Sequence, residues 1–513
     1  MMSVPVSNDR RWWALIVLTL PVLIISMDAT VLGFAVPSLS ASLAPSSSQL
    51  LWIVDIYSFV LAGLLITMGA LGDRIGRRRL LMFGAAGFSV ASVLAAFSTS
   101  PEMLIVARAM LGVAGATLMP STLSLIRNMF DDDRERQTAI AVWASAFAFG
   151  SALGPIVGGV LLEHYWWGSV FLVGVPLTAA LLVIAPRLVP ESRDPSPGVF
   201  DMTSAGLSLV AMLVVVYAVK MFAENGMSST VVVAAIVGTT AGSLFVRRQQ
   251  RVTDPMIDMS FFALPRFRMA VSGNLIAAFG FAGSLFFVTQ YLQLVVGMSP
   301  LRAGLQLLPA AGASVTFTML APIAARRFGP FAVIAGGLTL GSIGFALLSQ
   351  VTAEGSVALT TAAVMVLNAG FGSSMTVAID GILAALPPER AGAGASVSET
   401  AVEIGIALGT AVLGSIAAAV YRSSLVDVDG VSADALDASR DTLGAAIDTA
   451  ERVGGPPGDA LRAAADAAFV DGFHAAALTA TVAVGAIAVW AVRTRLQRHD
   501  VIEPDYAVTT SGH

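Results

Sequence analysis

Long apolar stretches separated by short polar segments make up the hydrophobicity pattern of most of the chain. A helix needs about 20 apolar residues to cross a bilayer, and fourteen stretches of this sequence are long and apolar enough. The pattern therefore predicts an all-α polytopic membrane protein. The predicted spans are residues 12–37, 49–71, 80–98, 103–126, 137–162, 167–186, 202–219, 228–247, 270–293, 301–324, 331–350, 356–385, 394–420 and 471–493.

The first apolar stretch follows a basic flank at Arg10 and Arg11, so a cleaved signal peptide is one interpretation. The stretch is longer than the apolar core of a typical signal peptide, and it contains Asp28. We therefore expect it to stay in the protein as the first membrane helix.

The distribution of arginine and lysine tests this division into spans, because basic residues concentrate in cytoplasmic loops. With the N-terminus inside, 22 of the 29 basic residues fall in inner segments, six fall in outer segments, and Arg108 falls within a span. A wrong number of spans would scramble this alternation. We therefore expect a multi-pass protein of the plasma membrane with both termini in the cytoplasm.

The composition narrows the classes of function. Only 12% of the 513 residues are charged and 56% are hydrophobic, whereas a soluble domain carries about 25% charged residues. The lack of cysteine excludes disulfides, iron–sulfur clusters and thiol catalysis, and the four histidines are too scattered for a metal site. Composition alone also allows a channel or a membrane enzyme. The sequence has no P-loop and no nucleophile motif, which argues against an ATP-driven pump and a membrane enzyme. We therefore expect a protein that is not an enzyme and that binds no cofactor, metal or nucleic acid.

One long outer segment, residues 421–470, differs from the rest of the chain. It holds nine acidic residues and four arginines, and it is rich in alanine. We expect two short helices broken at 454–457, forming either a solvated cap or a gate or partner surface.

Three motifs indicate how the helices work together. GALGDRIGRRR, at residues 69–79, combines glycines for a tight turn with an acid and arginines; a plain stop-transfer cluster would explain the arginines alone. LIVARAMLGVAGA, at 104–116, places an arginine inside a span. GSALGPIVGG, at 150–159, has small residues for close helix packing and a proline that removes a backbone hydrogen bond. The residues expected to support conformational change are Gly69, Asp73, Arg74, Gly76, Arg77, Gly154, Pro155 and Gly158.

These motifs resemble the signatures of the major facilitator superfamily. With fourteen spans, LWIVDIYSFVLAG in the second and SETAVEIG in the thirteenth, the chain is similar to the 14-spanner drug:proton antiporters. It resembles LfrA-type actinobacterial multidrug efflux pumps most and QacA-type pumps more distantly. The resemblance implies six-helix bundles at 1–200 and 251–513, the second including the outer segment, with two inserted helices at 201–250. It also implies a monomer that exports lipophilic cations, such as quaternary ammonium compounds, dyes and some fluoroquinolones.

Charged residues inside the first bundle are candidates for proton coupling, since such residues are costly within a membrane. Asp28 lies about 13 Å below the outer end of its span, Asp55 about 9 Å and Arg108 about 8 Å. We expect them to form one polar cluster that faces a central cavity. A static Asp–Arg pair is the alternative, but one arginine cannot fully neutralise two acids, so the second acid is a natural proton site.

Glu399 and Glu403 lie one helical turn apart, about 8 Å and 14 Å above the inner end of the thirteenth span. This spacing puts both on one helix face, and repulsion between them favours a proton on at least one near neutral pH. Glu399 has an alternative as an interfacial partner of Arg390. Glu403 is harder to explain by structure alone because of its depth, whereas Asp380, near the inner end of the twelfth span, is as easily structural as functional.

Aromatic side chains provide apolar and cation–π contacts for a lipophilic cation, although most aromatic residues in membrane spans face lipid or other helices. Beside the acids Asp28, Asp55 and Glu403, the candidate substrate contacts are Phe34, Trp52, Phe59, Trp143, Phe147, Phe149, Gln290, Tyr291, Gln293 and Asn368.

Two functions fit these observations. The first is a proton-coupled multidrug antiporter that works by alternating access. The second is a proton-coupled exporter of a physiological lipid, peptide, siderophore or secondary metabolite, which would use the same scaffold.

Overall fold

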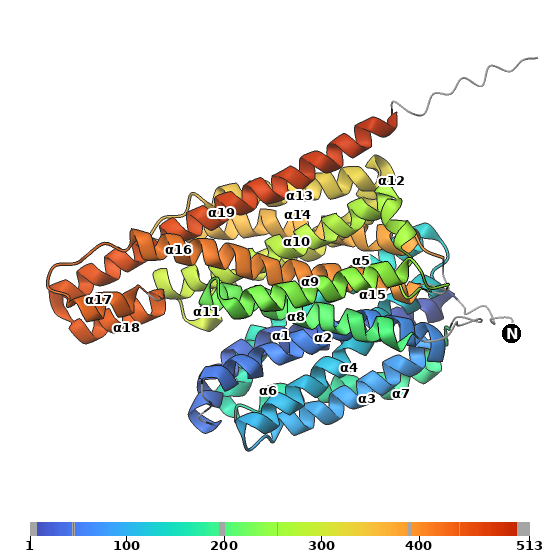
Figure 1. The fold of residues 1–513 in the computed structure, drawn as a ribbon, viewed down its shortest axis with the longest axis horizontal. Coiled ribbons are helices and arrows are strands. Elements are labelled where there is room, and N and C mark those ends of the chain that lie inside the picture. Colours follow the sequence, from blue (N-terminus) through green and yellow to red (C-terminus); the bar gives the residue numbers. More distant parts are fainter. Residues whose placement is uncertain are drawn as a thin grey trace, which may run out of the picture.

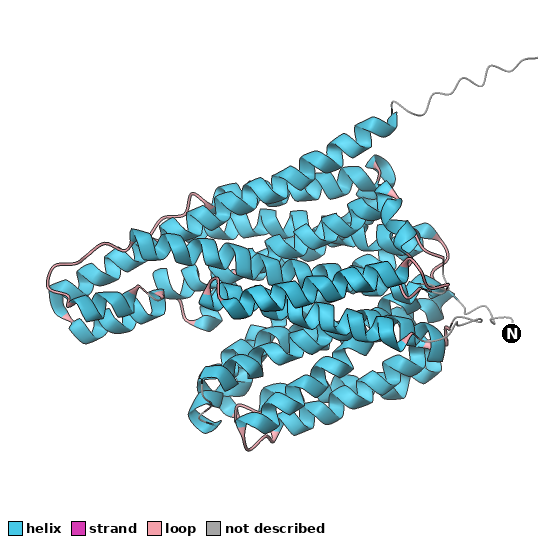
Figure 2. Ribbon diagram, viewed as in Figure 1, coloured by secondary structure: helices cyan, strands magenta, loops and turns pink. Residues whose placement is uncertain are grey.

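The computed structural model describes residues 8–43, 45, 47–193, 201–253, 255–387, 391–440 and 442–499. This part of the chain is almost entirely helical and contains no strand (Figures 1 and 2). Fourteen of its helical segments are long and apolar enough to cross a membrane, which confirms the predicted fold class and the predicted number of spans.

The first six spans are built from seven helices, because Val173 interrupts the sixth span. Polar side chains fix several helix starts: Ser100 accepts a hydrogen bond from the Met103 amide, and Asp132 accepts from the amides of Arg134 and Glu135. The helices are α1 (Asn8–Leu43), α2 (Ser47–Ile75), α3 (Arg77–Ala96), α4 (Pro101–Met129), α5 (Asp133–His164), α6 (Ser169–Leu172) and α7 (Gly174–Leu188).

Two further spans, α8 (Met202–Asn225) and α9 (Ser229–Gln249), form a hairpin. Arg248 donates to both carboxylate oxygens of Asp201, at 2.7 and 3.0 Å, and these hydrogen bonds hold the pKa of Asp201 well below its usual range. Gln249 donates to the Ser204 hydroxyl at 2.7 Å. The hairpin is therefore closed by polar contacts at one end, while α8 packs on α2.

The remaining spans contain more interruptions than the hydrophobicity pattern suggests. Two π-helical turns, at Tyr291–Val295 and Gly409–Leu413, interrupt the ninth and thirteenth spans. The helices are α10 (Pro265–Gln290), α11 (Pro300–Gln306), α12 (Leu308–Phe328), α13 (Pro330–Leu348), α14 (Val357–Ala384), α15 (Ala391–Leu408), α16 (Gly414–Ser424), α17 (Ala433–Ser439), α18 (Leu443–Val453) and α19 (Gly455–His499).

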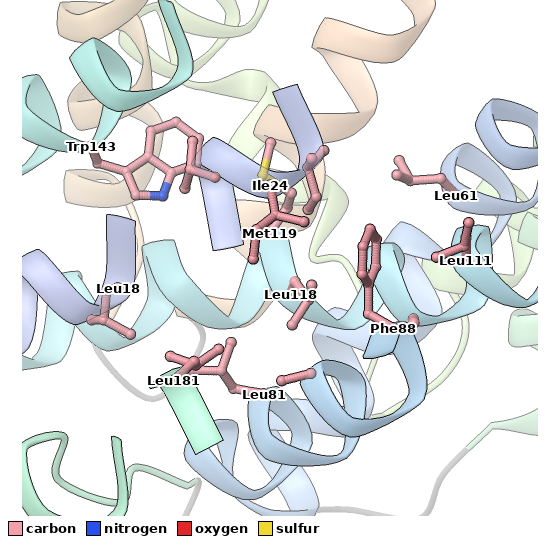
Figure 3. Close-up of a cluster of buried hydrophobic side chains, with 14 of the residues drawn as sticks. Leu18, Ile24, Leu61, Leu81, Phe88, Leu111, Leu118, Met119, Trp143 and Leu181 are labelled. Carbon is pink, nitrogen blue, oxygen red and sulfur yellow. The ribbon is translucent and has the colours of Figure 1, made fainter. Parts of the chain in front are cut away.

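Two large clusters of buried apolar side chains hold the molecule together. The first is formed mainly by α1 to α7; Figure 3 shows part of it, including Phe88, Leu118 and Trp143. The second is formed by helices between α10 and α19. The division of the chain at 200 and 250 stays a prediction, although each cluster draws mostly on one side of it.

The two ends of the helical array differ in character. Helix α1 begins and α19 ends at the same end of the molecule (Figure 1). We call this end, with the arginine-rich turn at 74–79, the basic face. The opposite end carries α17 and α18, and we call it the cap face.

The outer segment differs in part from its prediction. Two short helices, α17 and α18, precede Gly454, which has a positive φ of 65°. After this break, however, the chain enters α19, which runs without interruption into the last span. The prediction of one short helix on each side of the break is therefore wrong. The stretch before Gly454 forms two helices, and the stretch after it joins the last span because its alanine-rich sequence continues the helical pattern of the span. Leu436, Leu443 and Leu461 join the second apolar cluster, so the cap is packed on the C-terminal helices.

Candidate functional site

A buried ion pair joins α1 and α4 in the first group of helices. Arg108 Nη1 lies 2.7 Å from Asp28 Oδ2, and the side chains are only 3% and 12% exposed. Arg108 Nε also donates to the Ile53 carbonyl oxygen of α2 at 3.1 Å. The arginine therefore ties three helices together around one carboxylate, as the shared depth of Asp28 and Arg108 predicts.

Tyr57 completes this cluster and was missed by the sequence reasoning. The Arg108 guanidinium lies 4.7 Å from the centre of the Tyr57 ring, which is suited to cation–π attraction. Tyr57 lies within electrostatic range of Asp28, Arg108 and Glu403. Tyr57 lies one helical turn after Ile53, whose carbonyl oxygen accepts a hydrogen bond from Arg108. The sequence could have indicated this role only if the pairing of α2 with α4 had been known.

Glycines of α5 bring that helix against α1 beside Asp28. A Cβ atom at Gly154 would lie 1.9 Å from Thr30 Oγ1 and 3.3 Å from the Met27 carbonyl oxygen. A Cβ at Gly150 would lie 2.0 Å from Ser26 Oγ. The small residues of GSALGPIVGG are therefore needed where α5 crosses the segment of α1 that holds the acid. The Gly158 position is less tight, with Val31 at 3.5 Å.

The two glutamates of α15 differ in their surroundings although they lie on one face. Glu399 is 3% exposed, and its Oε1 atom has no hydrogen-bond partner among the described residues. Glu403 is only partly buried, and it acts electrostatically on both Glu399 and Tyr57. Helix α15 packs on α2 and α4, so Glu403 lies within electrostatic range of Tyr57 in the Asp28–Arg108 cluster.

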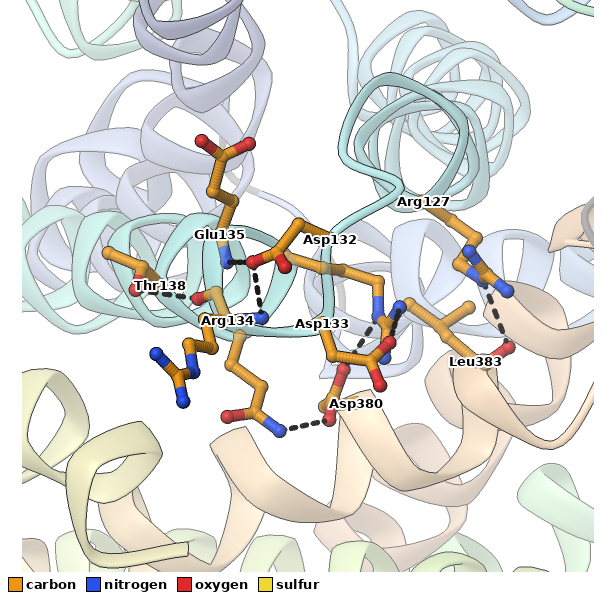
Figure 4. Close-up of polar contacts among 10 residues, drawn as sticks. Arg127, Asp132, Asp133, Arg134, Glu135, Thr138, Asp380 and Leu383 are labelled. Atoms are coloured by element: carbon orange, nitrogen blue, oxygen red, sulfur yellow. Dashed lines mark hydrogen bonds and ion pairs between the residues drawn. The ribbon is translucent and has the colours of Figure 1, made fainter. Parts of the chain in front are cut away.

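Asp380 connects the two groups of helices at the basic face. Arg136 Nε of α5 donates to Asp380 Oδ1 of α14 at 2.9 Å, and Gln137 donates to Oδ2 at 3.2 Å (Figure 4). Arg136 also donates to Asp133 at 2.7 Å. Arg127 of α4 donates to the Leu383 carbonyl oxygen at 3.4 Å. Asp380 is therefore engaged by the other half of the molecule, and these contacts join the two groups of helices at the basic face.

The GALGDRIGRRR turn is held by polar contacts to the segment after α7. Arg77 pairs with Asp73 at 2.5 Å, and it donates to the Ser192 hydroxyl at 3.0 Å. Gly76 has a φ of 108°, and a Cβ there would lie 2.7 Å from Glu191. Only glycine fits this turn without strain, so Gly76 allows the tight connection between α2 and α3. Gly69 is buried and Arg74 partly buried on the last part of α2.

The aromatic candidates lie in different environments. Trp52 is 40% exposed, and its ring centre lies 6.1 Å from that of Phe59 in an edge-to-face arrangement. The ring centres of Phe59 and Tyr217 of α8 are 6.5 Å apart. Trp143 is 1% exposed, and its indole nitrogen donates to Thr122 Oγ1 at 3.0 Å. The structure thus gives Trp143 a packing role between α4 and α5, and its role as a substrate contact stays a prediction.

The other candidates are spread more widely. Phe147 packs partly buried against the first apolar cluster, whereas Phe149 is 52% exposed. Gln290 and Asn368 donate to carbonyl oxygens of their own helices, at Phe286 and Val364. The Tyr291 hydroxyl binds the 352–356 turn, while Gln293 is partly buried. The side chains of Phe34, Asp55 and Pro155, and all of Arg390, lie outside the described part of the structure.

Comparisons with known proteins agree with this architecture. The Major Facilitator Superfamily model matches residues 18–410. The multidrug efflux pump LfrA of Mycolicibacterium smegmatis is 48% identical over 479 residues, covering 93% of this chain and 95% of that protein. The methyl viologen resistance protein SmvA of Salmonella typhimurium is 33% identical over 493 residues, covering 95% and 99%.

Two further similarities extend this picture. The tetracenomycin C resistance and export protein of Streptomyces glaucescens is 32% identical over 411 residues, covering 79% of this chain and 76% of that protein. Among solved structures, the human organic anion transporter MFSD10 aligns with a TM-score of 0.59 at 15% identity, covering 93% of this chain and all of that chain. The structural likeness supports the fold alone.

Proposed function

The chain belongs to the major facilitator superfamily, and from this premise we propose that it exports lipophilic cations in exchange for protons. The membership makes it an integral membrane transporter rather than an enzyme. The observation that carries the proposal is the packing of α15, which holds Glu399 and Glu403, on α2 and α4 of the first group of helices, which brings Glu403 within electrostatic range of the same ring, Tyr57, as Asp28. A cationic cargo and protons would compete for these carboxylates.

This competition would couple the two fluxes. A cationic cargo that reaches the cluster pairs with a carboxylate. A proton that replaces the cargo neutralises the same carboxylate and allows the carrier to reset. Coupling of this kind requires different binding in the two conformations. Exchange of one proton for one monovalent cation moves no net charge and is electroneutral. The membrane potential, about 2.3 kcal/mol per charge per 100 mV, therefore does not drive it.

The contacts at the basic face support an alternating-access cycle. We place this face in the cytoplasm because most arginines lie on that side in the predicted topology. The ion pair of Arg136 with Asp380 and the hydrogen bond from Ser396 Oγ to the Leu65 carbonyl oxygen then join the halves on the cytoplasmic side. These contacts support our inference that the cytoplasmic side is closed in this conformation and that breaking them would admit the cargo.

A second candidate is export of a secondary metabolite, favoured by the similarity to the tetracenomycin C export protein. It shares the scaffold and the acids with the first candidate. Cells that express or lack the protein distinguish the two: the drug-export proposal predicts ethidium accumulation on deletion, restored by the wild-type gene but not by Asp28→Asn. Retention of an endogenous compound without any change in ethidium accumulation would support the metabolite exporter.

A further inference from the structure

An apolar groove opens on the side of the C-terminal helices, between two of them and away from the acid cluster. It has a volume of about 430 Å³ and lies between α12 and α13, over α14. Phe317, Leu320 and Phe328 of α12 line one side, Val333 and Gly336 of α13 line the other, and Ser373 of α14 lies at its base. None of the predicted transport residues lines it.

The groove exists because α12 and α13 each pack along α14 but pack far less on one another. Gly337 allows the close approach of α13 to α14, since a Cβ there would lie 2.5 Å from the Gly370 carbonyl oxygen. Its neighbour Gly336 faces open space, with no atom within 4 Å of a Cβ placed there. A larger side chain at Gly336 would therefore enter the groove without disturbing the helix contact.

The walls of the groove face the lipid rather than another helix. Phe317 is 41% exposed, Leu320 48% and Phe328 57%. Phe317 and Leu320 lie inside a helix apolar and long enough to span the membrane, and Phe328 is its last residue, beside Arg327. The volume lies within the range of about 300–1,000 Å³ that small ligands occupy, and an apolar lining of this shape suits an acyl chain.

Two arginines lie at the end of the groove on the basic face. Arg326 and Arg327 form the last turn of α12 and are exposed. The Arg327 guanidinium lies 5.4 Å from the ring of Phe328, which lines the groove. Basic residues at such positions between membrane helices bind anionic lipid headgroups, and guanidinium groups bind phosphate through paired hydrogen bonds. A lipophilic cation, in contrast, would find no carboxylate in the lining and two arginines in the adjoining last turn of α12.

We propose that this groove binds one anionic phospholipid, with an acyl chain between α12 and α13 and its phosphate at Arg326 and Arg327. The lipid fills a gap in the packing of α12 and α13 over α14. The site is separate from the transport site, so its occupation is measurable without transport.

The test is native mass spectrometry of the purified full-length protein with added phosphatidylglycerol or phosphatidylcholine. We expect the wild type to retain phosphatidylglycerol over phosphatidylcholine. The double variant Arg326→Gln/Arg327→Gln and the groove-filling variant Gly336→Leu should each retain one lipid fewer. Arg266→Gln/Arg268→Gln is the matched control, because it removes two exposed arginines at the start of α10 on the same face and should leave retention unchanged.

Several outcomes would overturn the proposal. Equal retention by the groove variants and the wild type would do so, as would an equal loss in the Arg266 and Arg268 control. Equal retention of the two lipids would remove the role of charge. If Gly336→Leu weakened ethidium binding and left lipid retention intact, the groove would be a cargo site instead. Thermal unfolding of each variant shows whether it is folded, and the arginine variant tests the site even if Gly336→Leu fails to fold.

Discussion

The guanidinium of Arg108 lies 2.7 Å from the carboxylate of Asp28, and the two side chains are buried between three helices of one half of the molecule. An ion pair in such a place is costly to break, because either partner alone would be a buried charge. In a transporter this sensitivity is useful, because a proton or a cationic cargo bound to Asp28 weakens the attraction between Asp28 and Arg108.

Replacing Asp28 by Asn should lower energised ethidium export by at least about tenfold, equivalent to about 1.4 kcal/mol, while the protein stays in the membrane. The amide keeps most of the shape but cannot carry the negative charge. Asp55→Asn should also lower export if both acids belong to the cluster. Dye efflux from energised cells, with membrane protein measured by immunoblot, checks this. Full export by both variants would refute the cluster.

Tyr57 should act through its ring. Tyr57→Phe keeps the surface that lies 4.7 Å from the Arg108 guanidinium, so export should stay within about twofold of the wild type. Tyr57→Ala removes a cation–π contact of about 2 kcal/mol when buried and should lower both export and thermal stability. A Phe variant as impaired as the Ala variant would instead assign the function to the hydroxyl.

Neutralising Glu403 should change the pH dependence of transport more than neutralising Asp380. Glu403 lies on α15, which packs on α2 and α4 of the other half, whereas Asp380 is already engaged by Arg136 and Gln137. Vesicles with an imposed pH gradient provide the measurement, using Glu403→Gln and Asp380→Asn side by side. The reverse order would contradict the assignment of Glu403 to proton coupling.

The Asp380–Arg136 pair should stabilise the closed basic face. Removing one partner of a buried ion pair costs about 3 kcal/mol or more, so Asp380→Asn should shift the population toward an open basic face. Asp133→Asn is the control, because Asp133 also binds Arg136 but is 81% exposed and lies on the same helix.

The wild type contains no cysteine, so two cysteines can carry spin labels at exposed positions, Asp131 just before α5 and Ala384 at the end of α14. The distance between the labels reports the separation of these helix ends. A longer distance in Asp380→Asn but not in Asp133→Asn is expected. Equal distances in all three proteins would show that the pair does not hold the face closed.

Gly154 should not accept even a methyl group. Gly154→Ala places its Cβ against Thr30 and the α1 backbone, so the α1–α5 contact beside Asp28 must widen, and we expect a lower unfolding temperature and lower export. Gly159→Ala is the matched control, since a Cβ there meets nothing within 4 Å. Thermal unfolding of the purified variants tests this, and equal stability of the two would contradict the packing role of the motif.

The hydrophobicity pattern predicted the fourteen spans because each crosses the same thickness of hydrocarbon. It also placed Asp28 and Arg108 at a similar depth, since depth follows from the rise per residue of a helix. Depth along a helix does not determine which neighbours a side chain meets. For this reason the sequence did not predict that Glu399 is the more buried glutamate, or that Asp380 pairs with Arg136 across the two halves.

The other differences have the same origin. Tyr57 was overlooked because its importance depends on the pairing of α2 with α4. Trp143 was selected as an aromatic residue in a span, but aromatic residues serve packing as readily as binding, and its hydrogen bond to Thr122 is a long-range feature. In the outer segment the break at Gly454 was predicted, but the stretch after it joins the last span as one helix, α19, because its alanine-rich sequence continues the helical pattern of that span.

The most direct test of the central claim is ethidium transport by the purified protein in proteoliposomes, with the pH gradient and the voltage imposed separately. A pH gradient at zero voltage should drive ethidium accumulation by the wild type, and Asp28→Asn should abolish this accumulation. Measuring a divalent cation beside ethidium shows whether the voltage contributes. Ethidium movement that is indifferent to the pH gradient would contradict proton-coupled export.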